Sequence, residues 1–368
     1  MELTKCKLGE LITQRREKND GSDLPICGVS KDGLIPPKQK EADTSIYNVF
    51  YRDDFIFNPA RMELNSIAIN DMYDRAICSS LYEVFYVHRT DLLLPHYLKL
   101  IIRQKRFTRY CEFLGQGSAR EYCRFSNISE IEIEFPPVEE QQKIVDYNTV
   151  IENRIALKQK INDNLEATLS ALYKEFFTIT SSDELPFGWR VAPFSDIAAI
   201  TMGQSPQGDD CNNDGVGEPL LNGPTEFGFY SPSPVQWTTN GKKHCAEGDL
   251  LFCVRGSTTG RMNWANQSYA IGRGLAAIHH KSDCTLNWFV KAMIDNSLQE
   301  ILSAATGSTF PNVGKDLLNG FQVIIPDDNS LREFGVKGHS IFSMISNNAK
   351  EIDVLVGLQR TLLSKLTI

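Results

Sequence analysis

The residues that could carry out chemistry in this chain form short motifs, and none of them is complete. The tetrad at 58–61, NPAR, departs from the Asn-Pro-Pro-aromatic tetrad of amino-methyltransferases, because Arg cannot stack on a flipped base as an aromatic ring does. The segment 115–117, GQG, lacks the third glycine of a dinucleotide loop, and 256–261, GSTTGR, lacks the Gly-Lys-Ser/Thr of a P-loop. Pro326-Asp327 is not followed by the Glu-x-Lys of a nuclease. We therefore expect no catalytic site in this chain.

Metal-binding patterns are equally incomplete. The chain has six histidines and nine cysteines, and no pair of cysteines has the C-x-x-C spacing of a zinc ribbon or a redox pair. His244, Cys245 and Cys253 could supply ligands, but free buried thiols are the favoured interpretation. We expect no metal and no cofactor in this chain.

Binding chemistry is better represented, first in the stretch from Tyr97 to Arg124. Seven cations oppose only Glu112 and Glu121 there: Lys99, Arg103, Lys105, Arg106, Arg109, Arg120 and Arg124. If the stretch 95–113 is a helix, Lys99, Arg103 and Arg106 share one face of it. Such a face suits contacts to DNA phosphates, and Arg side chains can also read bases. A solvated face with its cations extended into water explains the pattern equally well.

A second group of cations lies among aromatic residues in the second half of the chain. Its members are Lys242, Lys243, Arg255, Arg261 and Arg273, interleaved with Trp237, Trp264 and Tyr269. Arg61 and Gln204 lie in expected loops and complete the predicted DNA-binding set. The formal net charge of −8 argues against a generally polybasic DNA coater, but it allows a local basic face.

An internal repeat organises the chain around these residues. Gly117-Ser118 recurs as Gly307-Ser308, a shift of 190 residues, and the same shift brings Pro136 onto Pro326. At the front of each half, 8–11 (LGEL) corresponds to 194–197 (FSDI), and 54–57 to 249–252, with different offsets. This pattern predicts one duplicated unit whose inner loops have diverged.

Each half ends in a segment with helical periodicity. Residues 138–177 contain no Pro or Gly, and acidic residues in the first turn suit the helix dipole. In the second half, Ser330 and Glu333 predict a capping box, and Gly335 and Gly338 are expected to delay or kink the helix. The apolar residues recur at spacings of three to four and form the predicted spacer and partner-docking stripes: Ile144, Ile151, Ile155, Leu165, Leu172, Phe176, Ile341, Ile345, Ile352, Leu355, Leu362 and Leu366.

These stripes must be covered, and two arrangements would cover them. Each stripe would either pack on its own domain or pair with the other as an intramolecular coiled coil. The first helix of about 40 residues would be roughly 60 Å long, more than the width of one domain, so pairing is favoured. Lys158, Asn162, Asn348 and Gln359 interrupt the stripes with polar groups.

The remaining segments mix short alternating strands, turn clusters and one helix each, which indicates an α+β fold. The chain of 368 residues is therefore predicted to contain a domain at 1–136, a first spacer helix at 137–180, a domain at 181–326 and a second spacer helix at 327–368. No stretch is apolar for long enough to span a membrane, and the N-terminus lacks a signal-peptide core, so a cytoplasmic location is expected.

The order of these segments resembles the specificity subunit of type I restriction–modification systems. The resemblance rests on 8–12 (LGELI) and 194–206 (FSDIAAITMGQSP) at the start of each body, and on 57–69 (FNPARMELNSIAI) and 250–261 (LLFCVRGSTTGR) within them. The entry to the first long helix, 135–145 (FPPVEEQQKIV), and the closing 358–366 (LQRTLLSKL) extend it. The entry to the second helix, 325–338, departs from the pattern, which puts the equivalence of the two docking faces in doubt.

The resemblance implies two target-recognition domains held apart by two long antiparallel helices. Each domain would read one half of a bipartite double-stranded DNA target, and the helices would set the spacer and dock two methyltransferase subunits. Restriction subunits that translocate DNA would join them. S-adenosylmethionine, ATP and Mg²⁺ would belong to those partners.

Two alternatives from other classes stay open at this point. One is a stand-alone DNA methyltransferase or nuclease that carries its own recognition domains. The other is a coiled-coil scaffold that binds only proteins. Methyl transfer by the chain alone would favour the first, and DNA binding without base preference would favour the second.

Overall fold

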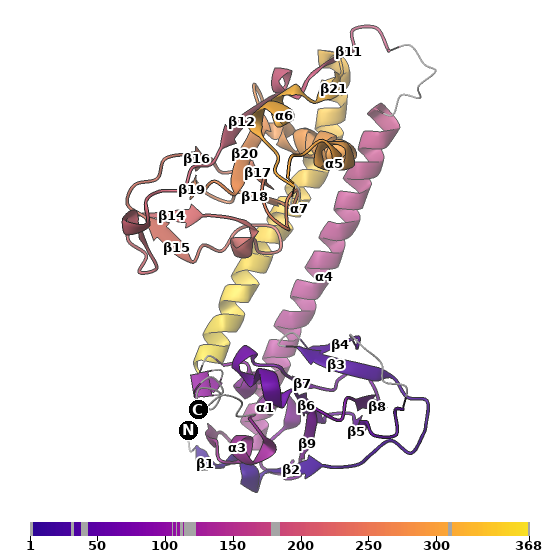
Figure 1. Ribbon diagram of the computed structural model, residues 1–368, viewed down its shortest axis with the longest axis vertical. Helices are drawn as coiled ribbons and strands as arrows, with labels where there is room; N and C mark the ends of the chain where they lie inside the picture. The colour runs from indigo at the N-terminus through magenta and orange to yellow at the C-terminus, as the bar shows by residue number, and fades with distance from the viewer. Residues whose placement is uncertain are drawn as a thin grey trace. The chain divides into compact units, whose positions relative to one another are not determined.

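The structure is a computed structural model that describes residues 3–30, 33–37, 43–104, 106–107, 109–110, 113, 123–177, 185–307 and 311–366. The chain divides into two compact units: unit 1 comprises Met1–Ile155 and Val354–Ile368, and unit 2 comprises Ala156–Asp353 (Figure 1). Within the described part of the chain, no helix is long and apolar enough to span a membrane.

Unit 1 contains ten short strands and two short helices in its described part. The strands are β1 (Thr4–Lys7), β2 (Ile12–Arg15), β3 (Ile26–Ser30), β4 (Gly33–Ile35), β5 (Asn48–Tyr51), β6 (Phe55–Phe57), β7 (Ile67–Ile69), β8 (Arg75–Cys78), β9 (Glu83–Val87) and β10 (Glu132–Phe135). The helices are α1 (Pro95–Ile102) and α3 (Phe125–Ser129). Two four-stranded sheets, β2-β9-β6-β7 and β4-β3-β8-β5, make up most of it, and β1 pairs with β10.

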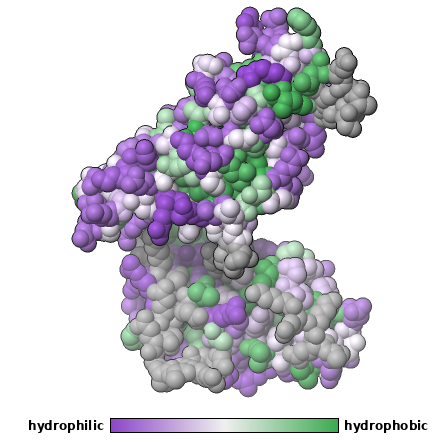
Figure 2. Space-filling view, turned by 45° about the horizontal axis from the view of Figure 1, so that its top comes forward, coloured by the Kyte–Doolittle hydropathy of each residue, from purple (hydrophilic) through white to green (hydrophobic). Residues whose placement is uncertain are grey.

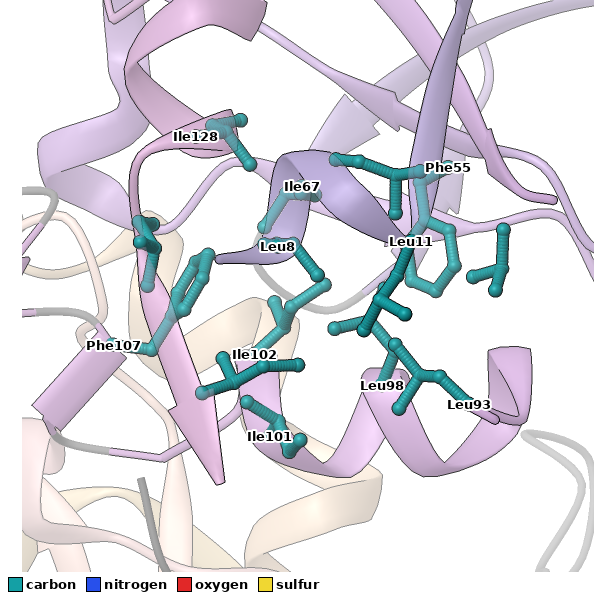
Figure 3. Close-up of a cluster of buried hydrophobic side chains, with 14 of the residues drawn as sticks. Leu8, Leu11, Phe55, Ile67, Leu93, Leu98, Ile101, Ile102, Phe107 and Ile128 are labelled. Atoms are coloured by element: carbon teal, nitrogen blue, oxygen red, sulfur yellow. The ribbon is translucent and has the colours of Figure 1, made fainter. Parts of the chain in front are cut away.

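The inner sheet of unit 1, β2-β9-β6-β7, is buried on both faces. Phe55 and Phe57 of β6 join a core with α1 and α3, whereas Ile56 between them joins a second core against the outer sheet. This alternation follows from the two-residue period of a strand, and it explains why FIF is apolar throughout. Figure 3 shows side chains of the first core, in which Leu98 and Ile101 from α1 meet Leu8 and Leu11.

Unit 2 contains the same kinds of elements. Its strands are β11 (Arg190–Pro193), β12 (Ala198–Met202), β13 (Cys211–Asn212), β14 (Glu218–Leu221), β15 (Gln236–Thr238), β16 (His244–Cys245), β17 (Leu250–Cys253), β18 (Met262–Trp264), β19 (Tyr269–Ile271), β20 (Leu275–His280) and β21 (Gln322–Ile325). Its shorter helices are α5 (Asn287–Ser303) and α6 (Lys315–Gly320).

The strand order of unit 2 parallels that of unit 1. Its inner sheet is β12-β20-β17-β18, its outer sheet is β13-β15-β14-β19-β16, and β11 pairs with β21. In both outer sheets one central pair is parallel: β3 with β8 in unit 1 and β14 with β19 in unit 2. The inner sheet again divides two cores, with Leu250 and Phe252 on one face and Leu251 and Cys253 on the other.

A buried aspartate turn occurs at the same place in each unit, just before β6 and just before β17. The Asp54 carboxylate accepts the N–H of Tyr51 at 2.8 Å, and the Asp249 carboxylate accepts the N–H of Ala246 at 2.8 Å. The residue before each aspartate has a positive φ, 66° at Asp53 and 86° at Gly248. Burial raises the pKa of both aspartates.

Two long helices, α4 (Val138–Phe177) and α7 (Asp328–Ser364), each contribute to both units. The helix α7 starts at Asp328, so the delayed start expected from Gly335 and Gly338 does not occur. A Cβ at Gly338 would lie 2.1 Å from the Trp288 ring, so this glycine allows close packing on α5. The predicted capping box is also wrong, because Asp327 caps the helix by accepting the N–H groups of Asn329 at 2.9 Å and Ser330 at 3.2 Å.

The polar residues that interrupt the two helical stripes hydrogen-bond to one another. In unit 2, Asn162 donates to Ile345 O at 3.1 Å and accepts from Asn348 at 2.8 Å. Lys158 donates to the Asn348 amide oxygen at 2.8 Å, so it meets the residue 190 positions along the chain. In unit 1, Gln359 donates to the Asn148 oxygen at 3.0 Å. Lys158 contacts Asn348, and Asn162, four residues later in α4, contacts Ile345, which is earlier in α7. The two helices therefore run antiparallel within unit 2.

All twelve predicted stripe residues are buried or half-buried. Ile144, near the start of α4, and Leu363, near the end of α7, pack against the core of unit 1, and Leu366 just beyond α7 lies in that core. Leu165 and Ile345 pack in the core of unit 2. Each long helix therefore covers part of the core of both units.

The first basic stretch does not form one continuous helix. The helix α1 ends at Ile102, and the Asn65 side chain donates to the carbonyl of Ile102 at 3.2 Å. This contact satisfies a carbonyl that the next turn would otherwise use. Lys99, Arg103 and Arg106 therefore do not share a helix face, which corrects the sequence-based expectation.

Candidate nucleic-acid interface

The predicted cations of unit 1 mostly lie next to carboxylates. Lys99 Nζ lies 3.1 Å from Asp71, Arg103 lies 2.9 Å from Glu152 on α4, and Arg124 lies 3.5 Å from Glu83. Each pair joins residues from different elements, so it ties α1, α4 and the sheet together as well as reducing the positive charge.

Two other predicted residues of unit 1 are exposed. Arg61 is exposed in the short 3-10 helix Pro59–Leu64, and Arg106 is exposed after α1. Arg120 lies outside the described residues. The described part of unit 1 thus gives no continuous surface of unpaired cations around Lys99 and Arg103.

The predicted cations of unit 2 lie in a different environment. Among the described residues, none of them forms an ion pair with a carboxylate, and all five are exposed: Lys242, Lys243, Arg255, Arg261 and Arg273. The Lys242 ammonium donates to the Asn240 oxygen at 2.7 Å, and the Arg261 guanidinium lies 5.9 Å from the Phe227 ring. Unpaired exposed cations are available to DNA phosphates and bases.

Backbone hydrogen bonds bring several of these residues to one edge of unit 2. Gln204 N donates to Ile271 O at 2.9 Å, and Ile271 N donates to Lys243 O at 2.8 Å. The N–H of Arg273 donates to the Ser205 hydroxyl at 3.2 Å. Gln204, Lys243 and Arg273 are thus neighbours although they are distant in sequence. Arg255 is attached to the same region, because Val254 N donates to Gly274 O at 2.9 Å.

Two amide side chains that the sequence did not single out lie at this edge. Asn222, at the end of β14, donates from Nδ2 to the Gln236 Oε1 atom at 2.7 Å. Asn222 is exposed and Gln236 is half-buried. Asn and Gln suit adenine recognition, but an amide at a strand end carries no distinguishing sequence signal of its own. We call Gln204, Asn222, Gln236, Lys242, Lys243 and Arg273 the unit 2 edge.

The unit 2 edge belongs to the outer sheet and the loops around it. Figure 1 shows β14, β15, β16 and β19 on the side of unit 2 away from α4 and α7. Figure 2 shows mainly hydrophilic residues at that end of the unit. This edge is polar and cationic, which is the composition expected of a DNA-binding surface.

No metal centre is present in the described part of the chain, where no group of three or more His, Cys, Asp or Glu side chains could hold an ion. Cys245 and Cys253 are buried free thiols. Burial raises the pKa of the Cys245 thiol to about 11. A buried neutral thiol is an inert packing group, as the sequence interpretation favoured.

Comparison with known proteins identifies the family that the chain resembles. Residues 6–167 match the family described as the type I restriction modification DNA specificity domain. A putative type I restriction enzyme MjaX specificity subunit from Methanocaldococcus jannaschii is 27% identical over 293 residues, 73% of this chain and 68% of the relative. The type I restriction enzyme MjaIX specificity subunit of the same organism is 25% identical over 297 residues, 75% of this chain and 69% of the relative.

The fold has a solved counterpart. The crystal structure of the S subunit of a type I restriction-modification system from M. genitalium superposes with a TM-score of 0.57 at 14% identity. The match covers 100% of this chain and 96% of that chain. The relatives are named for specificity, which agrees with the interpretation of this chain as a recognition component and not an enzyme. The resemblance inferred from the duplicated segments is thus confirmed: the chain resembles the specificity subunits of type I restriction–modification systems, and residues 6–167 match their DNA specificity domain.

Proposed function

We propose that the chain is the DNA-recognition subunit of a type I restriction–modification complex, and that each unit reads one half of a bipartite target. The observation that carries this proposal is the matching strand order of the two units, because a bipartite target needs two recognition surfaces of similar build. The unpaired cations of the unit 2 edge support DNA contact. The predicted domain boundaries at 136, 180 and 326 are part of this proposal.

The helices α4 and α7 set the spacing between the two half-sites. They pair as an antiparallel coiled coil whose register is specified by the Asn162–Asn348 and Asn148–Gln359 hydrogen bonds. A buried polar pair of this kind is satisfied in only one register, because a slip would leave its groups without partners. A fixed register supports the role of a ruler.

The helices also dock the methyltransferase subunits. The predicted docking stripes are covered within the chain, so the exposed apolar residues of the helices take this role. They are Tyr147, Val150 and Leu157 on α4 and Val354 and Leu358 on α7, each more than half exposed. Tyr147, Val150 and Leu157 recur at helical spacing and share one face of α4. Restriction subunits join the resulting complex. S-adenosylmethionine, ATP and Mg²⁺ bind to the methyltransferase and restriction subunits and not to this chain.

Matched deletions test the ruler. Removing seven residues from each helix, centred on Lys158 and Asn348, shortens both by about 10.5 Å, close to three base pairs. We expect the assembled complex to select the same two half-sites with a spacer about three base pairs shorter. Selection from randomised DNA measures both properties. Changed half-sites, or an unchanged spacer in a folded variant, would contradict the proposal.

Docking is tested by Val150→Asp, with Thr149→Asp as the matched control on a neighbouring exposed position. A charge at Val150 would place an unpaired carboxylate in an apolar interface. We expect Val150→Asp to abolish co-purification of the methyltransferase subunit and Thr149→Asp to preserve it. Equal binding by both variants would exclude this face of α4 as the docking surface.

A further inference from the structure

Two glycines of unit 2, Gly203 and Gly274, hold three chain segments closer together than any other residue would allow. A Cβ at Gly203 would lie 2.1 Å from Gly272 O, and a Cβ at Gly274 would lie 2.3 Å from Asn222 O. Both obstacles are backbone atoms, so a side chain at either position would displace the chain. The ends of β12 and β14 therefore meet the turn between β19 and β20 in one fixed arrangement.

Asn222 connects this arrangement to the neighbouring strand. Its side-chain oxygen occupies the space beside Gly272, where a Cβ would lie 2.2 Å from it. Its Nδ2 atom donates to Gln236 at 2.7 Å. The Gly272-Arg273-Gly274 turn is thus held on one side by Asn222 and on the other by Ser205, whose hydroxyl accepts the N–H of Arg273.

Arg273 projects from this fixed turn as an exposed residue. No carboxylate among the described residues forms an ion pair with its guanidinium. The exposed Gln204 lies on the adjoining segment, anchored by its N–H to Ile271 O at 2.9 Å. A phosphate contact needs charge but little precision, whereas a base contact needs a donor fork held in register. The rigid mounting favours the second role for Arg273.

The lysines beside the turn suit the other kind of contact. Lys243 is joined to the same strand through its carbonyl, which accepts Ile271 N at 2.8 Å, and Lys242 precedes it. Both are exposed, and an ammonium group on a flexible stem acts as a point charge. The lysines would place the duplex while Arg273 reads it.

We propose that Arg273 donates two hydrogen bonds to O6 and N7 of one guanine in the half-site of unit 2, with Gln204 reading an adjacent base. Gly203, Gly274 and Asn222 are positioning residues that hold the turn. This inference rests on the proposed function, because it specifies how one of its two recognition surfaces works.

The main test is Arg273→Lys in the full chain assembled with its methyltransferase partner, by selection from duplexes randomised over the target. Lysine keeps the positive charge but lacks the two parallel N–H donors of the guanidinium group. We expect the guanine preference at one position to fall about tenfold or more, with the other half-site and the salt dependence of binding unchanged. Lys243→Ala is the matched control: it should weaken all sequences alike and lower the salt slope by about 1.

Gly274→Ala tests the mounting of the turn. Although Arg273 is still present, this substitution should weaken the preference for guanine at the same position of the target. Native tryptophan fluorescence would show that the variant is folded. If Arg273→Lys keeps the guanine preference, Arg273 is a phosphate contact or a surface cation, and the inference is overturned. If the unaltered chain selects no sequence at all, the proposed function itself fails.

Discussion

Units 1 and 2 share a strand order but differ in whether their predicted DNA-binding cations lie against carboxylates. In unit 1, the predicted DNA-binding residues Lys99, Arg103 and Arg124 lie against carboxylates of other elements. In unit 2, the corresponding group of cations, including Lys243 and Arg273, has no carboxylate partner in the described part of the chain. The scaffold is thus common to both, and the surface chemistry is specific to each.

The turn that follows the second strand of the parallel pair, β8 in unit 1 and β19 in unit 2, shows this difference most clearly. Unit 2 has Gly272-Arg273-Gly274 between β19 and β20, whereas unit 1 has Ser79-Ser80-Leu81-Tyr82 between β8 and β9. The first turn presents a guanidinium, and the second presents hydroxyls and Leu81, which is 77% exposed. The two turns therefore present different chemical groups at the same place in the two units.

The buried aspartates should give the largest contrast in stability. Arg15 donates to Asp54 at 2.6 and 3.1 Å, whereas the ion-pair partner of Asp249 is His279, at 3.3 Å. Asp54→Ala should therefore cost unit 1 about 3 kcal/mol, because it removes the buried carboxylate that pairs with the half-buried Arg15 guanidinium and accepts the N–H of Tyr51. Asp249→Ala should cost unit 2 about 1 kcal/mol.

Separate probes can follow the two units in this experiment. All four tryptophans, at 189, 237, 264 and 288, belong to unit 2, so their fluorescence reports its unfolding, and hydrogen exchange reports unit 1. The exposed Asp74, which pairs with Arg52, is the control, and Asp74→Ala should cost under about 0.5 kcal/mol. Equal losses for Asp54→Ala and Asp249→Ala would show that the two turns are energetically equivalent.

The polar residues between α4 and α7 should give a smaller contrast. Asn162→Ala removes two hydrogen bonds in unit 2 and should cost about 2 kcal/mol, whereas Asn148→Ala removes one in unit 1 and should cost about 1 kcal/mol. Denaturant unfolding measures both. Asn164→Ala, on the exposed side of α4, is the control and should leave the free energy of unfolding nearly unchanged. If it changed this free energy as much as Asn162→Ala does, the effect would come from helix propensity and not from the lost hydrogen bonds.

Salt dependence compares the cations of the two units directly. Each unpaired cation of unit 2 that contacts a phosphate should contribute about 0.9 to the slope of log affinity against log salt, so Lys242→Ala and Lys243→Ala should each reduce it by that amount. Lys99→Ala and Arg103→Ala should reduce it less, because Asp71 and Glu152 already neutralise those cations. Titrations of DNA binding at several salt concentrations would show whether unit 1 contributes equally.

The smallest effect concerns acid sensitivity. Burial lowers the pKa of His280, with a minor contribution from His279 and opposition from Asp283, and its Nδ1 accepts the N–H groups of Ser282 and Asp283. The unfolded chain therefore binds a proton at higher pH than the folded one. The contribution of His280 to the free energy of unfolding is fully present above the pKa of histidine in the unfolded chain, about 6.5. It is lost as the pH falls through the lower pKa of His280 in the folded chain.

Unit 1 has Val87 at the corresponding strand position, opposite Ile12 as His280 is opposite Ala198. Only unit 2 should therefore show this loss of stability, and His280→Asn should remove it. Denaturant unfolding followed by tryptophan fluorescence at pH 7 and pH 5 measures the change. An unaltered pH dependence in His280→Asn would assign the acid sensitivity to other groups.

Much of the architecture follows from local patterns in the sequence. The absence of Pro and Gly from 138–177 and the apolar spacing predict a helix there, and the structure has α4 at Val138–Phe177. Helix periodicity is a local property, so it can be read without knowing the fold. The same holds for the recurring segments that carry the family resemblance, and for the absence of complete catalytic motifs.

Other features depend on residues that meet only in the folded chain. Asn65 ends α1 through the carbonyl of Ile102, and Gly338 lies in α7 because Trp288 packs against it. Neither partner is near in sequence, so glycine and helix propensities alone led to wrong expectations at both places.

The sequence by itself determined the two long helices, the duplicated order of segments, and the two groups of cations. Only the tertiary structure decided that the cations near α1 have carboxylate partners, and that Gly203, Asn222 and Arg273 come together at one edge. The physical reason is that secondary structure depends on neighbours along the chain. The availability of a charge and the space around a glycine depend on which distant segments lie beside it.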